Sequence, residues 1–407
     1  MSYNNYSSRP QRRTSYGGGN SRFRGNGGGN KSRNMVKGRG QYIDPAKFVR
    51  EAQFKEEEQY TPVHTFADFK AAQLIKDNLA AKGYTIPSPI QDQTIPLGLD
   101  GKDVIGIANT GTGKTAAFAV PVLDKLLTNQ HSRALIIAPT RELAQQIEDE
   151  LRSIAKNSGL SGVLLIGGTP MGPQLRDLRS KPRVVIGTPG RIKDHLERGT
   201  LHLATFDQIV LDEVDRMLDM GFLPDVRFIL DSLKPERQSF FFSATMEPKV
   251  SQLIQTFSND PVTVSVKTSD TSDNVHQNVV HYNSKEDKIE KLHDALINDA
   301  VKKVIIFDET QRSVERLAIE LAGRGFATDA IHGGKSQGQR QRALNRFKAS
   351  DIDILVATDV AARGIDVKDI THVINYAIPQ TYEDYTHRVG RAGRAGATGH
   401  ALTFVSK

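Results

Sequence analysis

Short apolar runs alternate with polar, helix-like stretches from Phe66 to Val405. In the first half the apolar runs are residues 134–138, 162–166, 184–186, 208–211 and 239–242. In the second half they are residues 279–282, 304–307, 327–331, 352–357, 372–375 and 400–405. Apolar strands separated by helices are typical of a parallel sheet covered by helices on both faces. The rhythm is lost over residues 258–278, so the sequence predicts two α/β domains in tandem.

The region before the first domain has a different composition. Residues 1–43 contain seven Arg and two Lys and no acidic residue, whereas the rest of the chain has 45 basic and 47 acidic residues. The net charge of +7 therefore comes from this end of the chain. The segment is rich in Gly, Ser and Asn and poor in aliphatic residues, so we expect it to be disordered. The expected boundaries are a tail at 1–60, domains at 61–265 and 277–407, and a linker at 266–276.

Three roles are open for the basic tail. Arginines interspersed with Tyr and Phe can neutralise phosphates and stack on bases, which favours an auxiliary contact with nucleic acid. The tail could instead be a solvated segment that aids solubility. An organelle transit peptide is a third possibility, although the segment has no apolar helical stripe.

Composition excludes several classes of protein. The chain has no cysteine, which rules out disulfides, thiolate zinc sites and a cysteine nucleophile and fits a reducing compartment. No apolar run approaches the roughly 18 residues that a membrane span needs. We therefore expect a soluble, cytoplasmic protein without a membrane segment.

A glycine-rich segment follows the apolar run 104–108 and precedes a helix-like run at 114–127. Strand, glycine turn and helix form the context of a phosphate-binding loop. Gly111 and Gly113 let backbone N–H groups face an anion, Lys114 can reach the outer phosphates, and the Thr115 hydroxyl can ligate Mg²⁺. The usual leading glycine is replaced by Ala108. The expected loop contacts to a nucleoside triphosphate come from Ala108, Asn109, Thr110, Gly111, Thr112, Gly113, Lys114 and Thr115.

An acidic pair follows the apolar run 208–211. Asp212 can hold Mg²⁺, and Glu213 can accept a proton from an attacking water. The pair could alternatively cap a helix. Farther along, Arg388, Arg391 and Arg394 repeat every three residues between glycines. Arg391 and Arg394 could act as arginine fingers on the γ-phosphate, or the segment could be a basic helix face for nucleic acid.

Over residues 64–407 this ordered set of motifs resembles the DEAD-box RNA helicases of superfamily 2. Phe66 lies seventeen residues before a Gly-Tyr-Thr-Ile-Pro-Ser-Pro-Ile-Gln segment that ends at Gln91 and resembles the Q motif of that family. The resemblance implies two RecA-like domains and ATP, with Gln91 pairing to adenine, Phe66 packing on its ring and Asp366 bonding the ribose. The naming tetrapeptide is Asp-Glu-Val-Asp, with Val214 in place of alanine, and Ala392 replaces a threonine in the last motif.

The resemblance also implies RNA contacts and coupling residues. In the first domain the implied RNA contacts are Pro139, Arg141, Gly168, Thr188 and Arg191. In the second domain they are Thr310, Gln337, Arg340, Thr358 and Arg363. The residues implied to link hydrolysis to strand separation are Asp215, Ser243, Thr245 and His387. Turn, capping or buried-hydroxyl chemistry would explain any one of these motifs taken alone.

The sequence thus predicts an ATP-dependent RNA helicase that uses ATP and Mg²⁺ and has a monomeric core. It would grip RNA through the backbone, with little sequence preference. Three alternatives remain: a DNA translocase of the same superfamily, an ATP-dependent RNA clamp that nucleates an assembly, and an RNA chaperone whose tail promotes annealing. Stimulation of ATPase activity by RNA or DNA, complex lifetime against strand-separation rate, and tail deletion would distinguish them.

Overall fold

The computed structural model describes residues 43–52, 60–109, 111–266, 274–298, 300–362, 367, 369–393 and 397–407. Four predicted site residues lie outside these ranges: Thr110, Arg363, Asp366 and Arg394. No helix in the described part of the chain is both long enough and apolar enough to cross a bilayer.

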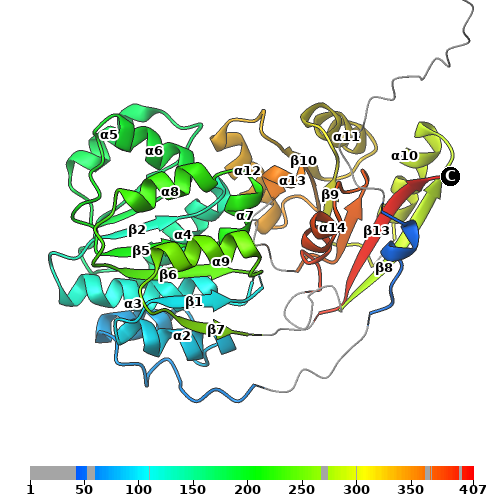
Figure 1. Ribbon diagram of the computed structural model, residues 1–407. Coiled ribbons are helices and arrows are strands. Elements are labelled where there is room, and N and C mark those ends of the chain that lie inside the picture. Colours follow the sequence, from blue (N-terminus) through cyan, green and yellow to red (C-terminus); the bar gives the residue numbers. More distant parts are fainter. Residues whose placement is uncertain are drawn as a thin grey trace, which may run out of the picture. The chain divides into compact units, whose positions relative to one another are not determined.

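In the described residues, the first domain contains a parallel sheet of seven strands in the order β3-β4-β2-β5-β6-β1-β7 (Figure 1). Its strands are β1 (Val104–Ile107), β2 (Ala134–Ile137), β3 (Gly162–Leu165), β4 (Val184–Gly187), β5 (Gln208–Leu211), β6 (Gln238–Ser243) and β7 (Val262–Ser265). Its helices are α1 (Gln73–Ala81), α2 (Pro89–Leu99), α3 (Lys114–Thr128), α4 (Arg141–Ile154), α5 (Met171–Arg179), α6 (Pro189–Glu197), α7 (Val214–Asp219), α8 (Leu223–Asp231) and α9 (Pro248–Phe257).

The sheet of the first domain separates two apolar cores. Ile136 packs in a core with residues of α1 to α4, whereas Leu135 and Ile137 pack in a core with residues of α6 to α9. Because neighbouring side chains of a strand point to opposite faces, a strand buried on both faces must be apolar throughout. The continuous apolar runs of the sequence follow from this arrangement.

Within its described residues the second domain has a parallel sheet of six strands in the order β10-β11-β9-β12-β13-β8 (Figure 1). The strands are β8 (Val275–Tyr282), β9 (Val304–Phe307), β10 (Thr328–Ile331), β11 (Ile354–Ala357), β12 (His372–Asn375) and β13 (Gly399–Ser406). The helices are α10 (Lys285–Leu296), α11 (Gln311–Gly323), α12 (Gln337–Lys348), α13 (Asp359–Ala362) and α14 (Tyr382–Val389). The predicted fold class, two tandem parallel-sheet α/β domains, is confirmed.

Two strands extend into the stretch where the sequence rhythm is lost. β7 pairs in parallel with β1 at the edge of the first sheet, and Val264 is its one buried residue. An edge strand with so little buried surface has no continuous apolar signal. β8 begins at Val275, inside the expected linker 266–276, so the linker expectation is wrong at that end.

The expected tail, residues 1–60, also differs in part from the structure. Pro45–Phe48 forms the 3₁₀ helix η1, which contacts β8 in the second domain (Figure 1). The side chain of Phe48 is buried, with its ring centroid 4.6 Å from that of Tyr385. Residues 43–52 are therefore not part of a disordered tail. One aromatic residue among polar neighbours has no periodicity that the sequence analysis could detect.

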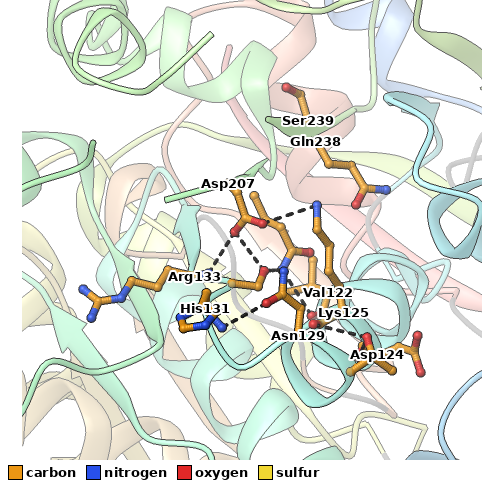
Figure 2. A network of polar contacts seen from close by, with 12 residues as sticks. Val122, Asp124, Lys125, Asn129, His131, Arg133, Asp207, Gln238 and Ser239 are labelled. Carbon is orange, nitrogen blue, oxygen red and sulfur yellow. Dashed lines mark hydrogen bonds and ion pairs between the residues drawn. The ribbon is translucent and has the colours of Figure 1, made fainter. Parts of the chain in front are cut away.

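A polar network fixes the amino ends of the strands in the first sheet (Figure 2). Asp207, which precedes β5, accepts hydrogen bonds of 2.8 Å from the Ser132 hydroxyl and the Arg133 N–H before β2. Lys125 of α3 lies 3.6 Å from the same carboxylate, and the Gln208 amide donates to Ser132 at 3.0 Å. These contacts join β2, β5 and α3 at the edge opposite the carboxyl ends of the strands.

Candidate functional site

The nucleotide motifs of the first domain follow three neighbouring strands. The glycine loop follows β1, Asp212 follows β5, and Ser243 ends β6, while the sheet order is β5-β6-β1. Because the strands are parallel, their carboxyl ends lie at one edge of the sheet, where ligands of open α/β sheets bind. The structure therefore brings the predicted loop, acidic pair and coupling motif together.

The glycine loop depends on the backbone conformation of its glycines. Gly111 and Gly113 have φ angles of 87° and 91°, a region that is costly for residues with a Cβ. A Cβ on Gly113 would also collide with the amide of Gln91. That amide donates to the Gly113 carbonyl at 3.0 Å, and the Ser88 hydroxyl donates to the Thr112 carbonyl at 2.7 Å. Residues at the start of α2, in the Q motif, thus hydrogen-bond directly to the glycine loop.

The two residues predicted to contact adenine lie in different places: Gln91 beside the glycine loop and Phe66 in the apolar core. Gln91 uses its carbonyl oxygen to accept from the Ser88 N–H at 2.8 Å and its amide to hold the loop. Phe66 is 3% exposed and packs edge-on against Phe69 and Tyr84. Adenine recognition by Gln91 and Phe66 stays a prediction.

Lys114 and Thr115 begin helix α3 immediately after the loop. The buried Lys114 ammonium donates to the Ala108 carbonyl at 2.8 Å, and the Thr112 hydroxyl donates to the Asn109 carbonyl at 2.8 Å. The Lys114 charge therefore lies at the amino end of α3, where the helix dipole is positive, and the two together favour binding of an anion.

The two neighbouring carboxylates have opposite pKa shifts. Burial raises the pKa of Asp212 to about 6, although Lys114 opposes this. Burial acts against ionisation of Glu213 too, but the charges of Arg216, Lys114 and Arg391 outweigh it and lower its pKa. Arg216 lies 3.4 Å from the Glu213 carboxylate. Glu213 also has a φ of 55°, an uncommon conformation for a residue other than glycine.

The oxygen donors at this edge fit a magnesium ion. Asp212 is 2% exposed, and a divalent cation would stabilise the ionised form that burial disfavours. The Thr115 hydroxyl supplies a second oxygen donor from the first turn of α3. Mg²⁺ in nucleotide sites is typically held by one or two such protein oxygens, with phosphate and water as further ligands.

Of the four predicted coupling residues, Asp215, Ser243 and Thr245 contact one another. Asp215 accepts hydrogen bonds from the N–H groups of Ala244 and Thr245, at 2.9 and 2.8 Å, and from the Thr245 hydroxyl at 3.2 Å. The Asp215 N–H donates to the Ser243 hydroxyl at 3.3 Å. α7, which begins just after Glu213, is thus tied to the end of β6. His387 of α14 has a pKa lowered to about 4 by burial and by the charges of Arg216 and Arg391.

The arginines of the last motif have different environments. Arg388 donates to the two carboxylate oxygens of Asp359 at 2.5 and 2.6 Å and to the Ala377 carbonyl at 2.7 Å. It therefore joins α14 to α13 and to the segment after β12 within the second domain. Arg391 is 3% exposed, and its charge contributes to the low pKa of Glu213. Of the two predicted fingers, Arg391 is the one within the described residues.

The residues with an implied RNA role in the first domain follow the other strands of its sheet. Pro139 and Arg141 follow β2, Gly168 follows β3, and Thr188 and Arg191 follow β4. These strands are neighbours, in the order β3-β4-β2. The Arg141 guanidinium packs against Gly168, where a side chain would collide with it. The five residues therefore lie along one half of the sheet's carboxyl edge.

The second domain has a corresponding arrangement. Thr310 follows β9, Gln337 and Arg340 lie on α12 after β10, and Thr358 follows β11, while the sheet order is β10-β11-β9. Arg340 forms an ion pair of 2.7 Å with Glu142 of α4, and both side chains are buried. The RNA roles of these residues stay predictions.

The sequence analysis missed three polar residues near the site. Arg216 could have been found, because it lies three residues after Glu213 and on the same helix turn. Glu142, the partner of Arg340, has no comparable local signal. Asp92 directly follows Gln91 and accepts hydrogen bonds from Tyr60, Val63 and His64.

Comparison with known proteins gives the family. The family model for DEAD/DEAH box helicases matches residues 88–253. The family model for the helicase conserved C-terminal domain matches residues 287–396. The chain is 45% identical over 346 residues to the DEAD-box ATP-dependent RNA helicase CshA of Geobacillus kaustophilus, covering 84% of this chain and 73% of that one. It is 42% identical over 344 residues to CshA of Bacillus subtilis, covering 84% and 69%.

Solved structures agree with this. Saccharomyces cerevisiae Dbp5 bound to RNA and ADP BeF3 is 27% identical with a TM-score of 0.74, over 84% of this chain and 90% of that one. Mss116p bound to ssRNA and AMP-PNP is 30% identical with a TM-score of 0.77, over 86% and 76%. The RecA-like fold implied by the resemblance is thereby confirmed, and the chain belongs to the family of DEAD-box ATP-dependent RNA helicases.

Proposed function

We propose that this protein is an ATP-dependent RNA helicase that hydrolyses ATP with Mg²⁺ when RNA draws its two domains together. The observation that carries the proposal is the charge distribution around Glu213. Lys114 and Arg216 of the first domain and Arg391 of the second domain all lower the pKa of this carboxylate. A base that is kept ionised by groups from both domains suits a reaction that depends on their closure.

In this proposal each residue has one task. Lys114 and the loop N–H groups bind the phosphates, and Glu213 accepts the proton of the attacking water. Arg391 stabilises charge on the transferred phosphoryl group. Mg²⁺, held by Asp212 and Thr115, would neutralise phosphate charge. Asp215 is hydrogen-bonded to Ser243 and Thr245, so a movement of the acidic motif on hydrolysis would also move the end of β6.

RNA is the proposed second ligand. The halves β3-β4-β2 and β10-β11-β9 present arginines, hydroxyls and helix N-termini, which suit contacts to phosphates and sugars rather than base edges. Two similar solved structures contain RNA together with ADP BeF3 or AMP-PNP. We infer weak sequence preference, a monomeric core, and an auxiliary RNA contact from the basic segment 1–43.

Strand separation would follow from closure. A strand gripped by both domains must adapt to their closed arrangement, and a bent strand no longer pairs with its complement over several bases. Hydrolysis and phosphate release would then reopen the domains. The expected activity is local separation of short duplexes or remodelling of RNA–protein complexes.

Substitution of Glu213 tests the proposal. RNA-stimulated turnover of ATP should fall by about 10²–10⁴ in Glu213→Gln, while ATP and RNA still bind, because an amide cannot accept the proton. Glu236→Gln, at an exposed position in the same domain, is the control. Unchanged turnover in Glu213→Gln would remove the base from the mechanism.

Two further measurements separate the rival functions. Equal stimulation of ATPase activity by DNA and RNA would favour a DNA translocase. A long-lived complex with ATP and RNA, without separation of a short duplex on that time scale, would favour an RNA clamp.

A further inference from the structure

Three of the first-domain residues with an implied RNA role meet at the loop between β3 and α5, residues 166–170. Gly168 is exposed at this loop with a φ of 75°, and the Arg141 guanidinium packs against it. The Arg191 guanidinium donates to the Thr169 carbonyl, with two of its nitrogen atoms at 3.4 Å. The conformation of the loop therefore decides how the glycine and the two arginines are placed relative to one another.

A buried glutamine of α5 holds this loop. Gln174 is 4% exposed, and its amide nitrogen donates to the Thr169 hydroxyl at 2.7 Å. The same nitrogen lies 3.2 Å from the Ile166 carbonyl and 3.3 Å from the Pro170 carbonyl, which also accept from it. The Thr169 hydroxyl in turn donates to the Ile166 carbonyl at 2.9 Å. One side chain thus bonds to both ends of the loop and to a hydroxyl between them.

A buried histidine of α6 fixes the orientation of that amide. The Nε2 atom of His195 lies 3.3 Å from the Gln174 side-chain oxygen, and its Nδ1 atom lies 2.8 Å from the Thr200 hydroxyl. Burial and the Arg191 charge lower the pKa of His195, so the ring is neutral at pH 7 and carries one proton. Because an amide oxygen can only accept, this proton is on Nε2, and Nδ1 accepts from Thr200.

The histidine proton makes a flip of the Gln174 amide costly. A flipped amide would turn its oxygen toward the two loop carbonyls and its N–H groups toward the N–H of His195. Several buried polar groups would then lose their partners at once, in surroundings where an unpaired group is expensive. His195 therefore selects the one amide orientation that holds the loop.

We propose that Gln174 and His195 are positioning residues for RNA, which fix the loop in the conformation that lets Gly168 and the two arginines hold one stretch of sugar–phosphate backbone. The inference rests on the proposed function and extends it to two side chains that are too deeply buried to touch RNA themselves. A loop that is held in place before RNA arrives loses less conformational freedom on binding, which raises the affinity.

Substitutions with matched controls test the proposal. Gln174→Met keeps a side chain of similar length and removes its polar contacts with the loop. Gln255→Met, at an exposed position of α9, is the same change elsewhere in the domain. His195→Phe removes the Nε2 donor, and His195→Gln supplies an amide donor in its place. His202→Phe, at an exposed position, is the control for the aromatic substitution.

The RNA concentration for half-maximal ATPase activity should rise about three- to thirtyfold in Gln174→Met and His195→Phe, because buried hydrogen bonds that hold the loop are lost. It should rise less in His195→Gln and stay at the parent value in both controls. The KM for ATP and kcat at saturating RNA should not change. Without RNA, backbone amides of residues 166–171 should exchange hydrogen faster in the same variants, whereas the peptide that contains Gly113 should not.

An unchanged RNA requirement in folded Gln174→Met, beside a parent that RNA stimulates, overturns this proposal alone. Faster exchange in both peptides, or an equal rise in the KM for ATP, also overturns it, because a general loss of packing would then be the cause. Should Gln174→Met fail to fold, Thr169→Val removes the hydroxyl that Gln174 bonds and makes the same test. A parent without RNA-stimulated ATPase activity overturns the proposed function and, with it, the RNA role of the two residues.

Discussion

At the scale of single residues, Asp212 and Glu213 show how one dipeptide supports two roles. Both are buried, yet the pKa of Asp212 is raised to about 6 and that of Glu213 is lowered. The difference comes from position, because Glu213 faces Arg216 whereas Asp212 has Lys114 as its main cation. Environments that push neighbouring pKa values apart mark acid–base and metal-binding assignments.

Replacing Arg216 should change the pH dependence of turnover. Arg216 lowers the pKa of Glu213, so Arg216→Ala should raise it and protonate the base at higher pH. The acid limb of kcat/KM therefore moves to higher pH. Arg216→Lys keeps the positive charge and should move the limb less. The measurement is RNA-stimulated ATPase from pH 5 to 9, with thermal melting as a check of folding. An acid limb that stays in place in Arg216→Ala would contradict the assignment.

At the scale of elements, three histidines stack across neighbouring strands of the second sheet. His372 of β12 lies opposite His400 of β13, with ring centroids 4.8 Å apart, and His400 lies opposite His276 of β8 at 5.4 Å. Burial, with the neighbouring His400, lowers the pKa of His372 to about 4. The neutral ring is thus favoured in the folded state.

The stability of the second domain should therefore fall in mild acid. The unfolded His372 ring takes up a proton near pH 6.5 and the folded ring near pH 4, so stability is full above pH 6.5 and decreases between these values. This group alone contributes a slope of up to about 1.4 kcal/mol per pH unit. Urea unfolding at pH 7.5 and 5.0 measures it, and His372→Phe should lose less stability over this interval than the parent. An equal loss in both proteins would rule out His372 as the cause.

The phosphate loop offers a matched pair of glycine substitutions. Gly113→Ala should weaken ATP binding at least about tenfold, since the residue has φ 91° and its Cβ meets the Gln91 amide. Gly101→Ala has a similar φ of 78° but an open environment, so both variants carry backbone strain, on the order of 1–2 kcal/mol. Nucleotide titration together with thermal melting separates the two effects. Equal loss of ATP affinity in both variants would show that the Gln91 contact is unimportant.

Most strands could be predicted because strands buried on both faces leave continuous apolar runs. β7 could not, since Val264 is its one buried residue, and Phe48 could not, since its partner Tyr385 is distant in sequence. Motif order was enough to find the loop and the acidic pair. Pairings between distant elements, such as Glu142 with Arg340, depend on packing that no local pattern encodes.

At the scale of the whole molecule, Arg391 belongs to the second domain, yet its charge helps to lower the pKa of Glu213 in the first domain. Arg391→Ala should lower kcat by about 10³ or more and change ATP affinity less, because the guanidinium acts mainly on charge that develops during phosphoryl transfer. Steady-state ATPase at saturating RNA and nucleotide titration measure the two quantities. Arg227→Ala, exposed on α8, is the control. A loss of affinity as large as the loss of turnover would indicate a ground-state contact.

The order of strands in the second sheet has a consequence for biosynthesis. β13 lies between β12 and β8, although the ribosome makes it after both. β8 therefore stays unpaired within that sheet until residues 399–406 emerge. Phe48 is translated before either domain, but it can pack against Tyr385 only after the second domain has been made. The first domain can fold during translation, as amino-terminal domains generally do. Docking of residues 43–52 would then be among the final steps of maturation and would mark a finished second domain.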